Sequence, residues 1–223
     1  MLEIETIYNG PGPFPAKGTF TTDIDGPVLI IISATAYSST WPNFSIGVQV
    51  DIDGEVAATA NVFANELMSH KALVSGVLAT KMTPGTHTYN IFPTSPYAIC
   101  DENDFATISM WPLPDQPFTW NFIGPLPQYT TLQSEVSGSA LVFVHGSAWT
   151  NQYPQSLGLV VVVDGNPVLT TQAWANVISS HQAVPALLAP ITLTPGPHQI
   201  GISTSSGDFM TDGNDFYALA VIY

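Results

Sequence analysis

The chain has 223 residues, of which only 9% are charged, and its formal net charge at pH 7 is −14. Typical globular domains contain about 25% charged residues. The sequence has no Arg, and its three cationic side chains are Lys17, Lys71 and Lys81. Phosphate groups and anionic membranes are bound through clusters of Lys and Arg, so this composition excludes nucleic acid and charged membrane surfaces as partners.

Targeting and crosslinking signals are missing from the sequence. The first residues, MLEIETIYNG, contain neither the basic region nor the long apolar run of a secretory signal. No stretch approaches the roughly 18 consecutive apolar residues of a membrane span. Cys100 is the single cysteine, so no intramolecular disulfide can form. We therefore expect a soluble protein made in a host cytoplasm without a signal peptide.

After an N-terminal segment, 1–17, the pattern predicts a first module over 18–111. Apolar and polar residues alternate from Ser45 to Ile52, which is typical of a half-buried strand. Asp53-Gly54 suits a type I′ hairpin turn, and Pro84-Gly85 suits a type II turn. Strands are predicted near 19–22, 28–36, 45–52, 55–62, 72–82, 86–92 and 104–111.

The chain then repeats itself. A linker rich in Pro and aromatic residues, 112–128, precedes a second module, 129–223. A shift of 111 positions places VDIDGEV on VVVDGNP, ANELMSHKA on ANVISSHQA, TPGTH on TPGPH and DENDF on DGNDF. These matches predict a tandem duplication that holds one phase throughout, without a gap.

Seven or eight short strands with regular turn signals in each copy predict an all-β chain of two tandem antiparallel β-sandwich (jelly-roll) domains related by internal duplication. The long apolar strand over 28–36, the Asp-Gly hairpin, the strand entered through TPGTHT and the final FATISMW strand resemble the C1q/TNF-like jelly roll. Similar modules occur in bacteriophage head and tail proteins. The resemblance implies trimeric assembly and a structural or receptor-binding role, and it supplies no catalytic residues.

The two copies differ on one strand face. Gln49 and Asp51 of the first copy correspond to Val160 and Val162 of the second, so that strand is apolar on both faces. Strands of this kind are usually covered on both sides. We therefore predict that Val160 and Val162 lie in an interface with the first module or with another subunit, or beneath the linker aromatics. The apolar terminal strand adds Val221 and Tyr223 to the predicted interface.

Two polar loops are candidates for a cation site. They contain Asp101, Asn103 and Asp104 in the first copy, and Asp212, Asn214 and Asp215 in the second. Calcium binds such oxygen ligands, usually six to eight of them, but Asx turns use the same residue types. We favour the turn and no cofactor, and keep calcium as the alternative. His70 and His181 are expected to stabilise loops, and His87 and His198 to lie at the rim of the sandwich.

Aromatic side chains at the module tips suggest a second function. Tyr37 and Trp41 in the first copy, and Trp149 and Tyr153 in the second, lie near Asn and Gln residues. Such side chains can stack on sugars, although they can equally plug the end of a sandwich or form a subunit contact.

No motif of a nucleophile elbow, phosphate-binding loop or metalloprotease is present, and Cys100 has no cationic neighbour in sequence to activate it. The sequence therefore favours a non-enzymatic structural or assembly protein of a virus particle, such as a phage capsid, decoration or tail component. We expect a homo-oligomer, with a trimer preferred, located in the virion alongside other particle proteins. The alternative is a carbohydrate-binding module, lectin-like or receptor-binding, that uses the tip aromatics.

Overall fold

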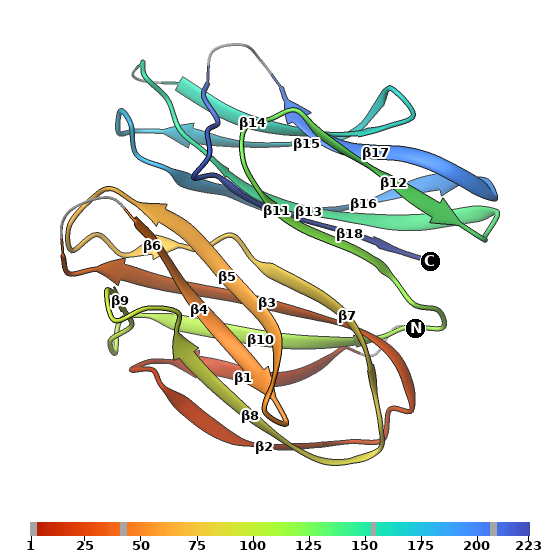
Figure 1. Cartoon of the computed structure of the whole chain (residues 1–223), viewed down its shortest axis with the longest axis horizontal. Coiled ribbons are helices and arrows are strands. Elements are labelled where there is room, and N and C mark those ends of the chain that lie inside the picture. The colour runs from red at the N-terminus through yellow and green to blue at the C-terminus, as the bar shows by residue number, and fades with distance from the viewer. Residues whose placement is uncertain (1–3, 41–43, 153–154, 206–208) are drawn as a thin grey trace.

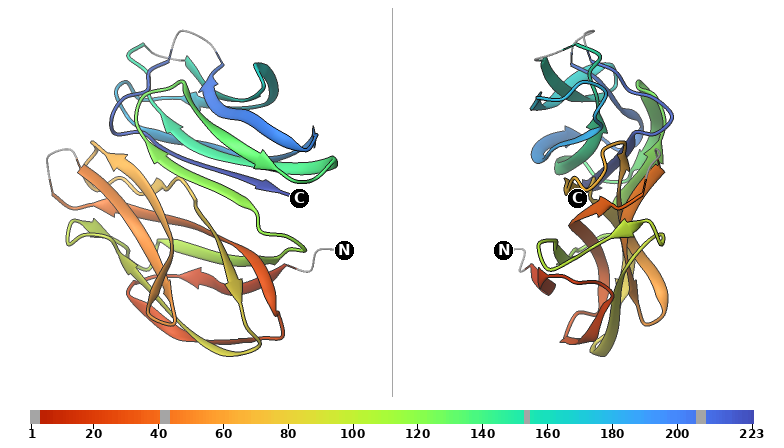
Figure 2. Two further views of the ribbon diagram at one scale, coloured as in Figure 1. Left: turned by 45° about the vertical axis from the view of Figure 1, so that its right-hand side comes forward. Right: turned by 90° about the vertical axis from the view of Figure 1, so that its left-hand side faces the viewer.

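The computed structural model describes residues 4–40, 44–152, 155–205 and 209–223. All regular structure in these ranges is β-strand, paired antiparallel within the sheets, and no membrane-spanning helix is found there. Strands that alternate apolar and polar residues need a second sheet to cover their apolar face. The chain meets this need twice, in two sandwiches that lie side by side, with β7 of the first alongside β11 of the second (Figure 1 and Figure 2).

Module one consists of two four-stranded sheets, with two short strands added to β3. The first sheet has the order β1-β10-β3-β7, and the second has the order β2-β8-β4-β5. The strands are β1 (Glu5–Pro11), β2 (Ala16–Thr22), β3 (Gly26–Ser38), β4 (Phe44–Ile52), β5 (Glu55–Ala64), β6 (Lys71–Ala72), β7 (Gly76–Met82), β8 (Gly85–Pro93), β9 (Ala98–Ile99) and β10 (Phe105–Pro112).

Module two repeats this order as β11-β18-β13-β16 and β12-β17-β14-β15. Its strands are β11 (Phe118–Ile123), β12 (Gln128–Ser134), β13 (Gly138–Ala148), β14 (Gln155–Val163), β15 (Asn166–Ala175), β16 (Gln182–Leu193), β17 (Gly196–Thr204) and β18 (Phe216–Ile222). Eight strands in two sheets, connected in this sequence, form a jelly roll. The predicted fold class is confirmed.

The modules begin earlier in the chain than the sequence predicts. The segment 1–17 contains β1, which pairs with β10, and the segment 112–128 contains β11, which pairs with β18. Each segment therefore supplies the first strand of a jelly roll. Proline and aromatic residues obscured the strand in the second case. The ring centroids of Trp120 and Phe122 lie 4.0 Å apart, and Phe122 stacks in turn on Tyr217.

The duplication also contains a shift of one residue, so the expectation of a gap-free repeat is wrong. Ile32 pairs with Ile108, and Val144 pairs with Leu219. The second partners, 108 and 219, are 111 positions apart, whereas 32 and 144 are 112 apart. Counterparts before the β3–β4 connection are therefore related by 112, and those after it by 111. The sequence motifs that define the repeat all lie after this connection, so they carry no sign of the shift.

The alternation predicted for β4 is confirmed, because Ile46, Val48, Val50 and Ile52 all lie in the interior of module one. The Asp-Gly turns are also confirmed. Asp53 and Gly54 have φ values of 51° and 86°, and Asp164 and Gly165 have 49° and 79°, as a type I′ turn requires at both central positions.

Each Asp-Gly turn is tied to the His that follows the Pro-Gly turn. His87 Nδ1 lies 2.6 Å from Asp53 Oδ2, and His87 Nε2 lies 2.8 Å from the Thr83 carbonyl oxygen. Both ring nitrogens face acceptors, so the protonated imidazole donates to both. The hydrogen bond to Asp53, followed by that to Thr83, raises the pKa of His87. The hydrogen bond from His87 lowers the pKa of Asp53.

Module two repeats this arrangement with His198, Asp164 and Thr194, at the same distances of 2.6 and 2.8 Å. The hydrogen bonds to Asp164 and Thr194 raise the pKa of His198. This repeated contact accounts for the recurrence of the TPG-x-H sequence, because the histidine fixes the hairpin turn beside it.

A raised folded-state pKa predicts how these contacts respond to pH. Below the unfolded pKa of about 6.5, both states are protonated and the contacts contribute fully. As pH rises through the folded pKa values, the contribution is lost. We expect the stability difference between the wild type and a His87→Gln/His198→Gln variant to narrow from pH 6 to pH 9 in urea unfolding. A difference that stays constant over this range would contradict the assignment.

Candidate functional site: the His–Asp loops and the contact between modules

The two acidic loops precede the last strand of each module and form Asx turns. Asp101 Oδ1 accepts a hydrogen bond from the Asn103 backbone N–H at 2.8 Å, and Asp212 Oδ1 accepts one from Asn214 at 2.7 Å. Asp104 is fully buried, and its Oδ2 accepts the Asp101 backbone N–H at 2.9 Å. The favoured interpretation of these loops as turns is confirmed.

Each loop contacts a histidine that lies 34 residues before the buried Asp in the chain. His70 Nδ1 lies 2.9 Å from Asp104 Oδ1, and its Nε2 lies 3.9 Å from Asp101 Oδ2. His181 stands in the same relation to Asp215 and Asp212, at 2.9 and 3.7 Å. Each cluster brings three ligand-type atoms within 4.8 Å of one another.

These clusters are satisfied by protein groups. Both oxygens of Asp104 have N–H partners, and Asp215 also accepts a hydrogen bond from the Ser147 hydroxyl at 2.8 Å. Burial raises the pKa of Asp215 and outweighs the opposing hydrogen bond from His181. One histidine and two carboxylates fall short of the six to eight oxygens that calcium prefers. Nothing in this geometry calls for a cation, and calcium stays a prediction.

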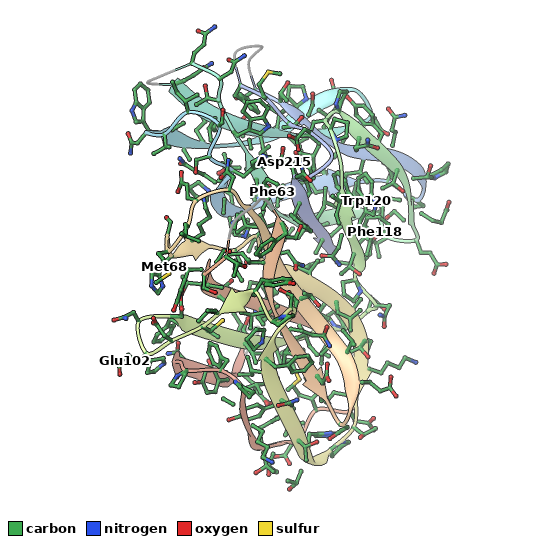
Figure 3. All side chains as sticks on the ribbon, turned by 60° about the vertical axis from the view of Figure 1, so that its left-hand side comes forward. Phe63, Met68, Glu102, Phe118, Trp120 and Asp215 are labelled. Atoms are coloured by element: carbon green, nitrogen blue, oxygen red, sulfur yellow. The ribbon has the colours of Figure 1, made fainter. Side chains whose placement is uncertain are left out.

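The two clusters differ in their exposure because module one covers the second cluster. The His70 side chain is 38% exposed, whereas that of His181 is 5% exposed. Phe63 of β5 packs edge-on against His181, with ring centroids 4.9 Å apart. Figure 3 shows Phe63 beside Asp215 where the modules meet.

The two tip aromatics that the structure describes, Tyr37 and Trp149, do not form an open stacking platform. Tyr37 is buried, and its ring packs on His70 at 4.5 Å. The indole Nε1 of Trp149 is buried, and its ring lies 5.8 Å from His181. For these two residues the structure favours the alternative in which aromatics plug the module end. The other two predicted residues, Trp41 and Tyr153, lie outside the described residues.

Lys71 links the two modules through a buried charge. Its Nζ donates to the Ser180 hydroxyl at 2.8 Å and to the His181 carbonyl oxygen at 3.1 Å, and it lies 3.4 Å from Glu66 Oε2. Burial lowers the pKa of Lys71 against the opposing effect of Glu66. Burial alone would raise the pKa of Glu66, but hydrogen bonding by Ser180 and the Lys71 charge hold it below its usual value.

A neutral histidine provides the second polar link. His145 Nδ1 accepts hydrogen bonds from the Ser75 backbone N–H and hydroxyl, both at 2.9 Å. The Val184 carbonyl accepts from the other ring nitrogen. Burial lowers the pKa of His145 to about 4, which keeps the imidazole neutral and its Nδ1 free to accept.

The third link satisfies an exposed sheet edge. The Asn121 side chain on β11 accepts the Val77 backbone N–H at 3.2 Å and donates to the Val77 carbonyl at 2.7 Å. β7 and β11 are edge strands of their sheets. The amide therefore pairs with backbone groups that would otherwise be left open at the edge.

An apolar cluster completes the contact. Leu29, Ile31, Val77 and Leu113 of module one pack against Phe143, Ala218, Ala220 and Ile222 of module two. Nothing in the sequence marked Asn121, His145 or Ser75 for this role, because each acts only where the modules meet. Lys71 was noted only as one of three cations.

The predicted interface residues lie elsewhere. Val221 is fully buried in the interior of module two, so its assignment to an interface is wrong. Side chains alternate along β18, and the contact uses Ala218, Ala220 and Ile222 instead. Tyr223 packs partly against the same interior.

Val160 and Val162 are half-buried on β14, outside the apolar cluster between the modules. They therefore do not form the contact with module one, which was one of the predicted alternatives. A subunit contact at these residues stays a prediction.

No protein-family model matches the chain, and no curated protein matches it. Among solved structures it is similar to PNGF-II at 8% identity and a TM-score of 0.39, covering 98% of this chain and 65% of that chain. It is similar to the stem and receptor-binding domain of the spike protein P1 from bacteriophage PM2 at 7% identity and a TM-score of 0.28, covering 99% and 96%.

The chain is also similar to the tandem CBM22-1–CBM22-2 domains of Paenibacillus barcinonensis Xyn10C, at 11% identity and a TM-score of 0.27, covering 100% and 90%. The chain thus spans less than two thirds of the length of PNGF-II. These scores support no conclusion about activity, and the C1q/TNF resemblance stays a prediction.

Lys71 offers a direct test of the polar contact. Replacing it with Met leaves Glu66 without its cation, and breaking a buried pair costs about 3–5 kcal/mol. Because Glu66 is 31% exposed, we expect a smaller loss, about 2 kcal/mol in the free energy of unfolding. Lys81→Met, at an exposed lysine, is the matched control and should change stability little. Equal effects of the two substitutions in urea unfolding would refute the role of Lys71.

The buried His145 should make the contact between the modules sensitive to acid. Its folded pKa lies below the unfolded value, so its contribution is present above pH 6.5 and is lost as pH falls toward 4. The loss is at most about 3–4 kcal/mol, since one pKa unit corresponds to about 1.4 kcal/mol. We expect wild-type stability to fall more steeply than that of His145→Gln between pH 7 and pH 4.5. Parallel pH profiles would show that His145 is not the titrating group.

Proposed function

We propose that this protein is a non-enzymatic assembly component that functions as a homo-oligomer. One observation carries the proposal. Module two exposes large apolar side chains on β15, β16 and the loop between them, at Trp174 (58%), Val177 (47%), Leu187 (39%) and Leu188 (38%). We call these four residues the apolar strip. Exposed apolar side chains on neighbouring elements are typical of protein contact sites.

Comparison with module one strengthens the argument. The counterparts of Trp174, Val177 and Leu188 are Phe63, Glu66 and Val77, and all three belong to the contact with module two. The apolar strip therefore repeats the edge of a surface that already binds a jelly roll. The counterparts of Leu29 and Ile31 at the centre of that surface, Leu141 and Phe143, are already covered by module one. The two described modules leave the side chains of the apolar strip exposed.

Two reactive groups among the described residues, the Cys100 thiol and the His145 imidazole, are not placed for catalysis. Burial raises the pKa of the Cys100 thiol to about 12, so it remains protonated at neutral pH. His145 is held neutral by burial, and both of its ring nitrogens are occupied by Ser75 and Val184. These features support a structural role.

The location in a virus particle rests on analogy of fold, because tandem jelly rolls serve in capsids as well as in lectins. The trimer and the partnership with other particle proteins are parts of the same proposal. Two of the four aromatic residues predicted for the carbohydrate-binding alternative, Tyr37 and Trp149, are packed inward and do not support it.

Light scattering at several protein concentrations tests this function. We expect a mass of at least twice 23.8 kDa, and the multiple of 23.8 kDa gives the number of copies. Electron microscopy of the same sample would show whether the oligomers build larger particles. A mass of one chain at every concentration, together with binding to a glycan array, would replace this proposal with the carbohydrate-binding alternative.

A further inference from the structure

The contact inside the chain joins two different edges of equivalent sheets. Module one contributes the β7 edge, and module two contributes the β11 edge. Each sheet has a second edge strand, which is β1 in module one and β16 in module two. The two unused edges are thus the counterparts of the two used ones.

The backbone at the β16 edge repeats the geometry of β7. Val77 lies opposite Ile31 in the ladder, and Leu188 lies opposite Phe143, which is the counterpart of Ile31. In this register the N–H and C=O of Leu188 point away from β13, toward the open edge. Val77 is 1% exposed beneath module two, whereas Leu188 is 38% exposed.

The complementary group is present on β1. Asn121 lies opposite Ala218, and Asn9 lies opposite Thr107, which is the counterpart of Ala218. The side chain that docks on Val77 is therefore repeated as the same amide in module one. Asn9 is exposed, and its Oδ1 accepts a hydrogen bond from the Thr107 hydroxyl at 2.9 Å.

A second pair of groups follows the same pattern. Phe63 covers His181 inside the chain, and its counterpart Trp174 is 58% exposed. The counterpart of His181 is His70, whose side chain is 38% exposed. Trp174 is thus exposed on the unused surface of module two, and His70 is exposed on the unused surface of module one.

We propose that a second copy of this chain docks head to tail, with the β16 edge of one copy on the β1 strand of the next. The Asn9 amide then accepts the N–H and donates to the C=O of Leu188 in the neighbouring copy, and Trp174 covers His70. This contact specifies the surface used by the homo-oligomer proposed above and rests on that proposal. It is heterologous, so copies join into a ring or a filament.

The contact between chains should be weaker than the one inside the chain. Module one presents Thr107 and Ser109 where module two presents Ala218 and Ala220. Burying hydroxyl groups costs more than burying methyl groups. We therefore expect association that depends on protein concentration.

Crosslinking of two single-site variants tests the contact directly. Asn9→Cys and Leu188→Cys chains carrying tags of different size are co-expressed and treated with a short bismaleimide. Because Asn9→Cys loses the amide, the reaction is run at a protein concentration well above that at which the wild-type oligomer forms. Native Cys100 is 4% exposed and should not compete. We expect a crosslinked pair of unlike chains. The control pair is Leu188→Cys with Thr131→Cys, an exposed position on β12 in the other sheet, and it should give little product.

Two substitutions supply an independent measurement. Leu188→Glu places a charge on the edge and should weaken association at least about tenfold in sedimentation equilibrium. Thr192→Glu, exposed on the same strand, is its matched control. Asn9→Asp retains an acceptor but loses the NH₂ donor, and should also weaken association. Unchanged circular dichroism would show that these variants remain folded.

The possible results distinguish the head-to-tail contact from homo-oligomerisation in general. An oligomer that gives no crosslink between positions 9 and 188 would overturn the head-to-tail contact while leaving homo-oligomerisation intact. Equally efficient crosslinking of position 9 to position 9, or of position 188 to position 188, would do the same. A protein that stays monomeric at all concentrations would overturn both.

Discussion

The architecture depends on how the open edges of its sheets are satisfied. An edge strand exposes backbone N–H and C=O groups, which bind another chain or must be blocked. In this protein the Asn121 amide occupies one such edge by pairing with both backbone groups of Val77. The apolar cluster around Ile31 and Phe143 and the buried Lys71 lie beside it. Together these contacts hold the two jelly rolls in one arrangement.

Because the chain is duplicated, each sheet edge used in the contact between modules has a counterpart in the other module. Two equivalent modules joined through unlike edges leave one edge of each kind unused. On the covered surfaces Lys71 and His181 are buried, whereas their counterparts Gln182 and His70 are more accessible. The open surface of module two is apolar and that of module one is more polar. This asymmetry suits a contact that forms reversibly between chains.

Local rules made much of the fold predictable from the sequence. Alternation along β4 and the Asp-Gly turns depend on neighbours in sequence, and both are confirmed. The first strands, β1 and β11, were missed because the prolines beside them are typical of a terminal segment or a linker. Val221 was misassigned because β18 is buried on both faces, and composition cannot tell the interior of the sandwich from the contact between modules. Asn121 and His145 gave no signal, since their roles exist only after the modules meet.

Hydrogen–deuterium exchange at two protein concentrations tests the central claim most directly, because it reports on both edges in one experiment. The account predicts that β7 (Gly76–Met82) is protected equally at low and high concentration, since module two of the same chain covers it. It predicts that β16 around Leu188 becomes more protected as concentration rises, in step with the oligomer. Protection of β16 that does not change while the oligomer forms would contradict the account.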